Sequence, residues 1–146
     1  MIALDLALSL RDAGLRWTPR PGDRFVLPHR GMDEEVFVLS DMTVEVHEFS
    51  TGRVIGFNGV TEWALDSVEQ SEALWLPAEH QLRELLGGMF RSLESTSAGY
   101  AVTVRLPDGE QTFTADEPAD AYATALLAVL RDVAAPTPDE AMPSVR

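Results

Sequence analysis

Residues 100–134 read YAVTVRLPDGEQTFTADEPADAYATALLAVLRDVA, and they carry the clearest structural pattern of the chain. Their first part alternates apolar with polar side chains, which is the period of a β-strand that has one buried face. The apolar positions of this alternation are Tyr100, Val102, Val104 and Leu106. Pro107, Asp108 and Gly109 then give a strong turn signal, and residues 111–115 can return as a second strand. The sequence therefore predicts a β-hairpin here.

A helix is expected directly after the hairpin. Acidic residues just before Pro118 are a helix-start signal, because an acid suits the N-cap and proline suits the first helical position. The pattern continues to about Ala134, and one face should point inward. That face comprises Tyr122, Leu126, Val129, Leu130 and Val133. Two prolines follow, so residues 136–146 are predicted to form a flexible C-terminal tail.

Two further helices are predicted upstream of the hairpin. Residues 2–13 carry an apolar stripe, and Gly14 is a plausible C-terminal stop. A second stripe predicts a helix that ends near Phe90, followed by a polar loop over residues 92–99. The side chains of this second stripe are Leu82, Leu85, Leu86, Met89 and Leu93.

Short strands joined by turns are predicted between the first two helices. They follow a proline-stiffened connector over residues 16–23 and a polar loop interrupts them at 29–35. The expected strands cover residues 24–28, 36–39, 41–49, 53–57 and 61–65. Strands connected in this way form antiparallel sheets. The predicted fold is α+β: a single, mainly antiparallel β-sheet with an N-terminal, a middle and a C-terminal helix packed on it, all in one domain over residues 1–135.

The composition is that of a globular chain. It has 146 residues, of which 45% are hydrophobic, and a mean hydropathy of −0.04, values that exclude wholesale disorder. No apolar run reaches the roughly 18 residues of a membrane span, and the start MIALD lacks the basic segment of a secretory signal. Cysteine is absent, which excludes disulfides, thiol catalysis and Cys-type metal centres. We expect a soluble, cytoplasmic protein that contacts no membrane and needs no cofactor.

Negative charge is concentrated in the middle of the sequence. The formal net charge is −13, and residues 32–76 hold ten acids against one arginine. Residues 1–31 hold five arginines against three acids, and the remaining acids follow residue 76. Because phosphate-backbone binding needs a basic patch, we expect no direct contact with nucleic acid. The acidic surface favours solubility, or alternatively a basic protein partner.

Asp41, Glu45 and His47 are the best local group of metal-ligating side chains. On a strand these residues share one face, and a carboxylate, a second carboxylate and an imidazole could complete three ligands of a metal ion. An ordinary solvated strand face has the same composition, and this second interpretation is the more frequent one.

The three tryptophans are candidate binding residues. Trp17 lies in the proline-stiffened connector, while Trp63 and Trp75 flank an acidic segment. Tryptophan is common at interfaces and in pockets because it combines a large apolar area with one hydrogen-bond donor. It is common in ordinary cores for the same reason, and exposure of Trp17 would favour the interface interpretation.

Three strings together resemble a family of small uncharacterised actinobacterial proteins, some of them labelled as pilus assembly proteins. The strings are AGLRWTP (13–19) with Gly22 and Asp23, VFVLSDMTV (36–44), and LWLP (74–77) with Gln81, Leu82 and Arg83. The resemblance covers roughly residues 3–90 and carries over no catalytic residue. The pilus label would imply an ATPase-like protein, whereas this chain has no phosphate-binding glycine loop of the required form. The hairpin and the alanine-rich helix after it resemble a small phage α-β-α sandwich domain.

No catalytic motif stands out, and three functional hypotheses remain open. The first is a non-catalytic protein-interaction module that acts as a homodimer or an adaptor through a strand edge. The second is a small-molecule- or metal-binding protein, or an enzyme, with a pocket near Trp17, Asp41, Glu45 and His47. The third is an acidic decoy or immunity-type partner of a basic protein.

Overall fold

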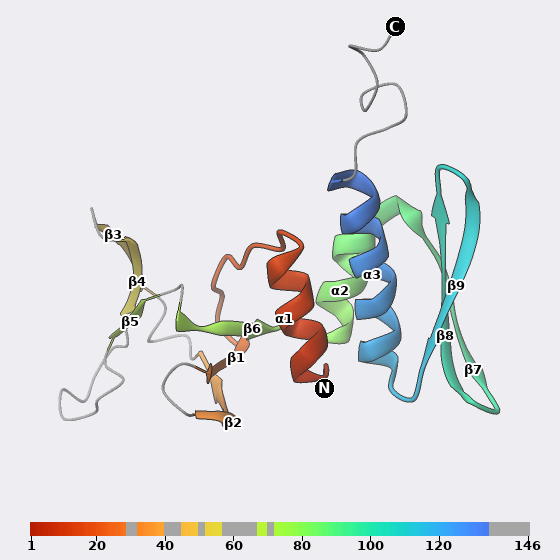
Figure 1. Ribbon diagram of the computed structural model, residues 1–146. Helices are drawn as coiled ribbons and strands as arrows, with labels where there is room; N and C mark the ends of the chain where they lie inside the picture. The colour runs from red at the N-terminus through yellow and green to blue at the C-terminus, as the bar shows by residue number, and fades with distance from the viewer. Residues whose placement is uncertain (29–31, 40–44, 50–51, 57–66, 70–71, 135–146) are drawn as a thin grey trace, which may run out of the picture. The chain divides into compact units, whose positions relative to one another are not determined.

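The computed structural model describes residues 1–28, 32–39, 45–49, 52–56, 67–69 and 72–134. The chain forms two compact units: unit 1 contains Met1–Leu15 and Glu79–Arg146, and unit 2 contains Arg16–Ala78. Helices and antiparallel strands are both present, so the predicted α+β class is confirmed (Figure 1). No helix in the described part of the chain is long and apolar enough to cross a membrane. The tail at residues 136–146 lies outside the described residues, and a single domain over 1–135 stays a prediction.

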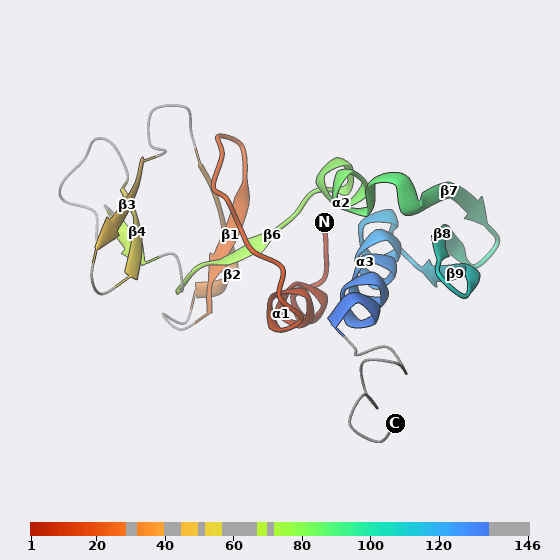
Figure 2. The same cartoon turned by 90° about the horizontal axis from the view of Figure 1, so that it is seen from above.

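Unit 1 combines one three-stranded antiparallel sheet with three helices. The sheet has the strand order β7-β8-β9, and its strands are β7 (Phe90–Thr96), β8 (Gly99–Leu106) and β9 (Gly109–Ala115). The helices are α1 (Leu4–Asp12), α2 (Glu79–Leu86) and α3 (Pro118–Ala134), with a 3₁₀ turn η3 (Gly87–Met89) after α2. Helix α3 packs on β8 and β9 and also on α1 and α2. It therefore lies between the sheet and the other two helices (Figure 2).

The alanine-rich composition of α3 explains how it can contact neighbours on two sides. Small side chains let a helix backbone approach its neighbours closely, and eight of the 17 residues of α3 are buried accordingly. Its buried residues are Ala119, Ala121, Tyr122, Ala123, Ala125, Leu126, Leu127 and Val129. Two of the five predicted inward positions differ: Leu130 is only half-buried, and Val133 is 76% exposed. Val133 lies in the last described turn, beyond the reach of the packed helices.

The predicted hairpin of residues 100–115 is confirmed, and its strands pair in unbroken register from Leu106–Gly109 to Tyr100–Ala115. The polar loop expected over residues 92–99 is wrong, because β7 occupies most of it. Strand β7 is exposed along most of its length, so its sequence lacks the apolar alternation that identifies a half-buried strand. A helix reaching Phe90 is also wrong: α2 ends at Leu86, because Gly87 adopts a positive φ of 58°.

Helix α1 ends as the sequence predicts. Gly14 adopts a φ of 107°, and its N–H donates to the carbonyl of Arg11. The N–H of Leu15 donates to the carbonyl of Leu10. These two bonds form a Schellman motif, which satisfies carbonyls that the helix end leaves without partners.

Unit 2 contains two small antiparallel sheets. One has the order β2-β1-β6 and contains β1 (Arg24–Leu27), β2 (Met32–Val38) and β6 (Leu74–Leu76). The other has the order β3-β4-β5 and contains β3 (Glu45–Phe49), β4 (Gly52–Gly56) and β5 (Ser67–Glu69). Strand β2 begins at Met32, inside the expected loop of residues 29–35, whereas the strand expected at 61–65 lies outside the described residues.

The prediction of a single sheet is wrong. Strand β6 returns to pair with β1, and β3 to β5 pair among themselves, so the strands of unit 2 close into two separate sets. The third set, β7 to β9, belongs to unit 1. Tight turns predict which consecutive strands pair, but they do not predict that a strand distant in sequence returns to an earlier one.

Candidate functional site

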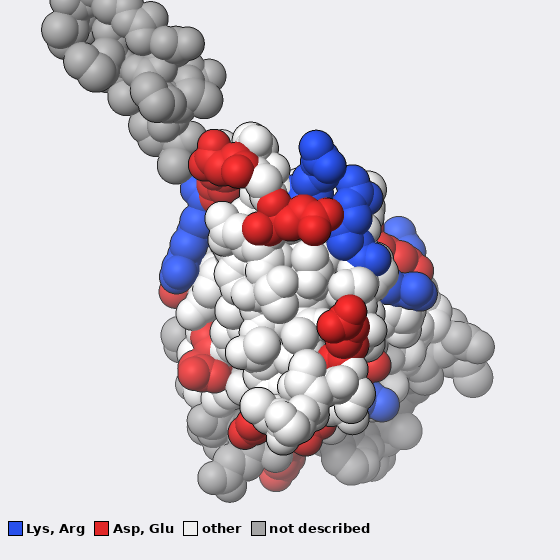
Figure 3. Space-filling model, turned by 90° about the vertical axis from the view of Figure 1, so that its right-hand side faces the viewer, with Lys and Arg blue, Asp and Glu red and all other residues white. Residues whose placement is uncertain are grey.

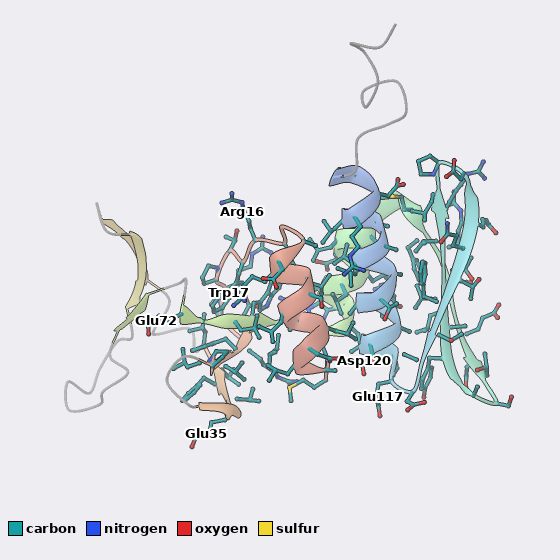
Figure 4. All side chains as sticks on the ribbon, viewed as in Figure 1. Arg16, Trp17, Glu35, Glu72, Glu117 and Asp120 are labelled. Carbon is teal, nitrogen blue, oxygen red and sulfur yellow. The ribbon has the colours of Figure 1, made fainter. Side chains whose placement is uncertain are left out.

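Trp17 is a core residue of unit 2. It is 7% exposed, and its indole Nε1–H donates to Oδ2 of Asp23 over 2.8 Å. The same Oδ2 accepts the backbone N–H of Arg20 at 3.0 Å, and Asp23 itself is 5% exposed. The connector therefore folds into a tight turn around one buried carboxylate, which holds the indole of Trp17. Figure 4 shows where Trp17 lies.

Aromatic rings gather around Trp17 on one side of the β2-β1-β6 sheet. Trp17 and Trp75 lie almost parallel, with ring centroids 6.5 Å apart and an interplanar angle of 10°. Phe25 lies 5.5 Å from Trp17 and the same distance from Phe37. Leu27, Leu39 and Ala73 complete this core cluster. The contacts support the core interpretation of Trp17, and a ligand-binding role for Trp17 or Trp75 stays a prediction.

The remaining predicted site residues are not brought into one described site. Asp41 and Trp63 lie outside the described residues. Glu45 and His47 lie on β3, where they pair with Gly56 and Val54 of β4. Within the described part of the chain, no group of three or more His, Asp or Glu side chains could hold a metal ion. A role for Asp41, Glu45 and His47 as a binding site therefore stays a prediction.

The open edge of the β7-β8-β9 sheet is the strongest candidate for an interaction site. Strand β8 pairs on both sides, whereas β9 pairs with β8 alone among the described residues. Figure 2 shows β9 as the outermost strand on one side of this sheet. Along β9, most side chains are exposed, and only Phe113 and Ala115 are half-buried.

The register of the hairpin identifies the backbone groups that this edge presents. Leu106 and Gly109 flank a two-residue loop and form its closing hydrogen-bonded pair. Hydrogen-bonded and non-hydrogen-bonded pairs then alternate along the two strands. The N–H and C=O groups that point away from β8 therefore belong to three residues of β9, namely Glu110, Thr112 and Thr114.

Strand β9 lacks the features that usually protect an edge strand. Proteins protect edges with charged side chains, prolines, bulges or very short strands. Strand β7, at the opposite edge, has an irregular register between Phe90 and Ser92 and carries Arg91 and Glu94. In unit 2, the edge strand β2 carries three consecutive acids, and β5 and β6 each span three residues. Strand β9 spans seven residues, has no proline, and carries one charged side chain, Glu110.

The outer face of the sheet is nearly neutral. Its hydroxyl-bearing side chains include Thr103 and Thr112, whose Oγ1 atoms form a hydrogen bond of 2.9 Å across the strands. Near one end of the sheet, Nε of Arg91 lies 3.8 Å from Oε2 of Glu110. On the side of the molecule that carries this sheet, charged side chains lie mainly toward the margins and uncharged ones cover the middle (Figure 3).

The inner face of the hairpin is supported by α3. Helix α3 contacts β8 and β9, and Tyr122 of α3 packs on Phe90 with ring centroids 5.7 Å apart. Burial raises the pKa of the Tyr122 hydroxyl, while the Arg83 guanidinium lowers it and the Glu79 carboxylate raises it further. Helix α3 therefore packs against the inner face of the sheet next to the β9 edge.

Sequence reasoning did not identify Asp23 and Asp120 as structural residues. Asp120 in the first turn of α3 accepts the backbone N–H of Ala3 at 2.7 Å, so it caps the start of α1 (Figure 4). A carboxylate two positions after Pro118 is a usable signal for a helix start, but it does not show which distant N–H it accepts. The β9 edge could be recognised from its sequence by the absence of proline and the low charge.

Comparison of the chain with protein-family models, with curated proteins and with solved structures finds no match. The resemblances to the actinobacterial family and to the phage sandwich domain therefore stay predictions, and the site is interpreted from its geometry alone.

Proposed function

We propose that this chain is a non-catalytic protein-interaction module that binds its partner by adding a strand to the open edge of β9. The observation that carries the proposal is the seven-residue β9 edge, which pairs with β8 alone among the described residues and whose outward N–H and C=O groups belong to Glu110, Thr112 and Thr114. In strand addition, such main-chain groups supply affinity and alternate side chains supply specificity.

Support for this choice comes from the contrast between the edges. Every other described edge strand is short, carries more charge, or has an irregular register, whereas β9 has none of these protections. Because α3 packs beneath β9, a partner strand would continue a layer that is already packed on one face. Little conformational entropy would then be lost by this chain on binding.

The proposal includes several points about cellular context. We place the module in the cytoplasm, acting as a homodimer or as an adaptor, without a cofactor and without direct contact with nucleic acid or membrane. The acidic charge of residues 32–76 supports the absence of nucleic-acid contact, because a negative surface repels a phosphate backbone. The pocket and acidic-decoy hypotheses stay predictions, since no described contact favours either.

Photo-crosslinking from the two edges of the sheet tests the proposal. A photoreactive amino acid would replace Thr114 on β9 in one variant and Ser95 on β7 in the other, and both positions are exposed. In cells of the native host, we expect a protein adduct from position 114 and none from position 95. Absence of any adduct from position 114, in a folded variant, would contradict the proposal.

A further inference from the structure

We infer that the partner at the β9 edge is a second copy of this chain, paired antiparallel with the first around a two-fold axis at Thr112. This inference rests on the proposed function and adds the identity of the partner and the register of pairing. The result would be one continuous six-stranded sheet, in which β9 of one copy lies beside β9 of the other.

The length of β9 selects Thr112 as the axis. Thr112 is the midpoint of Gly109–Ala115, so an axis at this residue pairs the whole strand with its copy. An axis one residue away in either direction leaves the ends of both strands without partners. Around Thr112, each outward N–H and C=O of Glu110, Thr112 and Thr114 meets the corresponding groups of the second copy.

The side chains of β9 are complementary to themselves in this register. Glu110 lies opposite Thr114 of the second copy, so the two carboxylates are kept apart. On the inner face, Gln111 lies opposite Phe113 of the second copy, which covers the half-buried Phe113 ring. Like charges directly opposite each other destabilise a strand pair, and within Gly109–Ala115 this register avoids them.

Charge also favours self-association at this edge over the acidic region of residues 32–76. A chain with a net charge of −13 repels its own copies. Residues 90–115, which contain the whole sheet, hold two arginines and three acids and so carry a net charge of only −1. Residues 32–76, with ten acids and one arginine, would oppose self-association far more strongly. Two acidic copies can therefore meet at the sheet with less electrostatic repulsion than at residues 32–76.

Engineered disulfides test the register, because the natural chain has no cysteine. In a Thr112→Cys variant the two introduced thiols face each other across the axis, with Cα atoms about 5.5 Å apart, inside the usual disulfide range of about 4.4–6.8 Å. In a Thr114→Cys variant the two introduced cysteines lie four residues apart along the paired strands. Their Cα atoms are then about 14 Å apart, which is too far for a disulfide. We expect rapid oxidation to a covalent dimer for Thr112→Cys and little for Thr114→Cys. Mixing Glu110→Cys with Thr114→Cys should restore the cross-link.

Proline substitutions test the edge itself. Thr112→Pro removes an N–H that the hairpin does not use, so it should preserve the monomer and abolish the dimer. Ser95→Pro is the matched control, because its N–H also points away from β8 but at the opposite edge. Light scattering over a dilution series should show a dimer for the wild-type chain and for Ser95→Pro, and a monomer for Thr112→Pro. Circular dichroism would verify that both variants are folded.

The outcomes separate this inference from the proposed function. A wild-type chain that stays monomeric at all concentrations, or equal cross-linking of the Thr112→Cys and Thr114→Cys variants, would overturn the inference. If position 114 then still photo-crosslinks to a different protein, strand addition at β9 survives and only the second copy is wrong. If neither self-association nor any adduct at position 114 is found, both are overturned.

Discussion

Asp23 is the one charged side chain that is buried among the described residues, and its carboxylate accepts hydrogen bonds from its own turn. Its Oδ2 accepts from the Trp17 indole and from the Arg20 backbone. Its main-chain oxygen accepts the N–H of Leu39, while Gly22 donates to the carbonyl of Leu39. Through its carboxylate and its main chain, Asp23 therefore links the connector, Trp17 and Leu39, the residue after β2.

Asp23→Ala should lower the free energy of unfolding by about 1–3 kcal/mol, because the buried indole N–H of Trp17 loses its acceptor. Urea unfolding followed by tryptophan fluorescence measures this change. Asp12→Ala is the control: Asp12 pairs with Arg11 at the exposed end of α1, and such surface ion pairs contribute about 0–1 kcal/mol. Equal effects of the two substitutions would contradict the structural role of Asp23.

Tyr122 should make the chain sensitive to alkaline pH. Burial raises the pKa of its hydroxyl above the ordinary value of 10.0, so the folded state favours the neutral phenol. The stability that this preference contributes is fully present below pH 10.0 and is lost as the pH rises through the raised pKa. The melting temperature of the wild-type chain should therefore fall as the pH rises above 10.0, and that of Tyr122→Phe should fall less.

Absorbance titration of the Tyr122 hydroxyl provides an independent check. Tyr100 is the other tyrosine of the chain, so Tyr100→Phe leaves Tyr122 as the sole chromophore of this type. The titration midpoint of the Tyr100→Phe variant should lie above the ordinary tyrosine pKa of 10.0. A midpoint at or below that value would show that Tyr122 is not a desolvated phenol.

At the scale of elements, local sequence patterns were sufficient to predict a helix or strand where one of its faces is buried. The hairpin of β8 and β9 and the helix α3 follow from alternation, a proline turn and a helix-start signal. Strand β7 could not be predicted in this way, because an exposed edge strand needs no apolar face. The end of α2 depends on the positive φ of Gly87. The apolar stripe in the sequence continues past this glycine, so it does not indicate where the helix ends.

Leu126→Ala should destabilise the chain by about 2–5 kcal/mol, since Leu126 of α3 is 3% exposed and its truncation leaves a cavity. Val133→Ala in the same helix is the matched control, because Val133 is 76% exposed. Its effect should lie within about 0.5 kcal/mol of zero. Chemical unfolding curves of the two variants give both values, and a neutral Leu126→Ala would exclude the packing of α3 described above.

At the scale of the whole molecule, class and element order were predictable, whereas the grouping of strands into three sheets was not. Pairing of β1 with β6 joins positions about fifty residues apart in sequence, and no turn residue encodes it. The candidate binding residues were likewise predictable only in part. Trp17 was identified as a residue of interest from its type, but its partner Asp23 depends on how the connector folds.

Net charge should make stability depend on salt. With a formal charge of −13, the folded chain repels itself, and added sodium chloride screens that repulsion. The melting temperature at neutral pH should therefore rise by a few degrees between low and high salt. Near pH 4.4, where the net charge calculated from the sequence is close to zero, the melting temperature should change little with salt. A melting temperature that falls with salt at neutral pH would show that attractive ion pairs dominate instead.

The hydrogen bond from Ala3 to Asp120 joins residues 117 positions apart, and unit 2 lies entirely between them in the chain. During synthesis, α1 leaves the ribosome first but cannot obtain its capping carboxylate until α3 has been translated. At ordinary rates of about 5–20 residues per second, that delay is roughly 6–25 s. Unit 2 can complete its own sheets during this interval, while α1 remains without the helix on which it packs. Nascent chains stalled at different lengths should therefore show the ring cluster around Trp17 protected from proteases before α1 is.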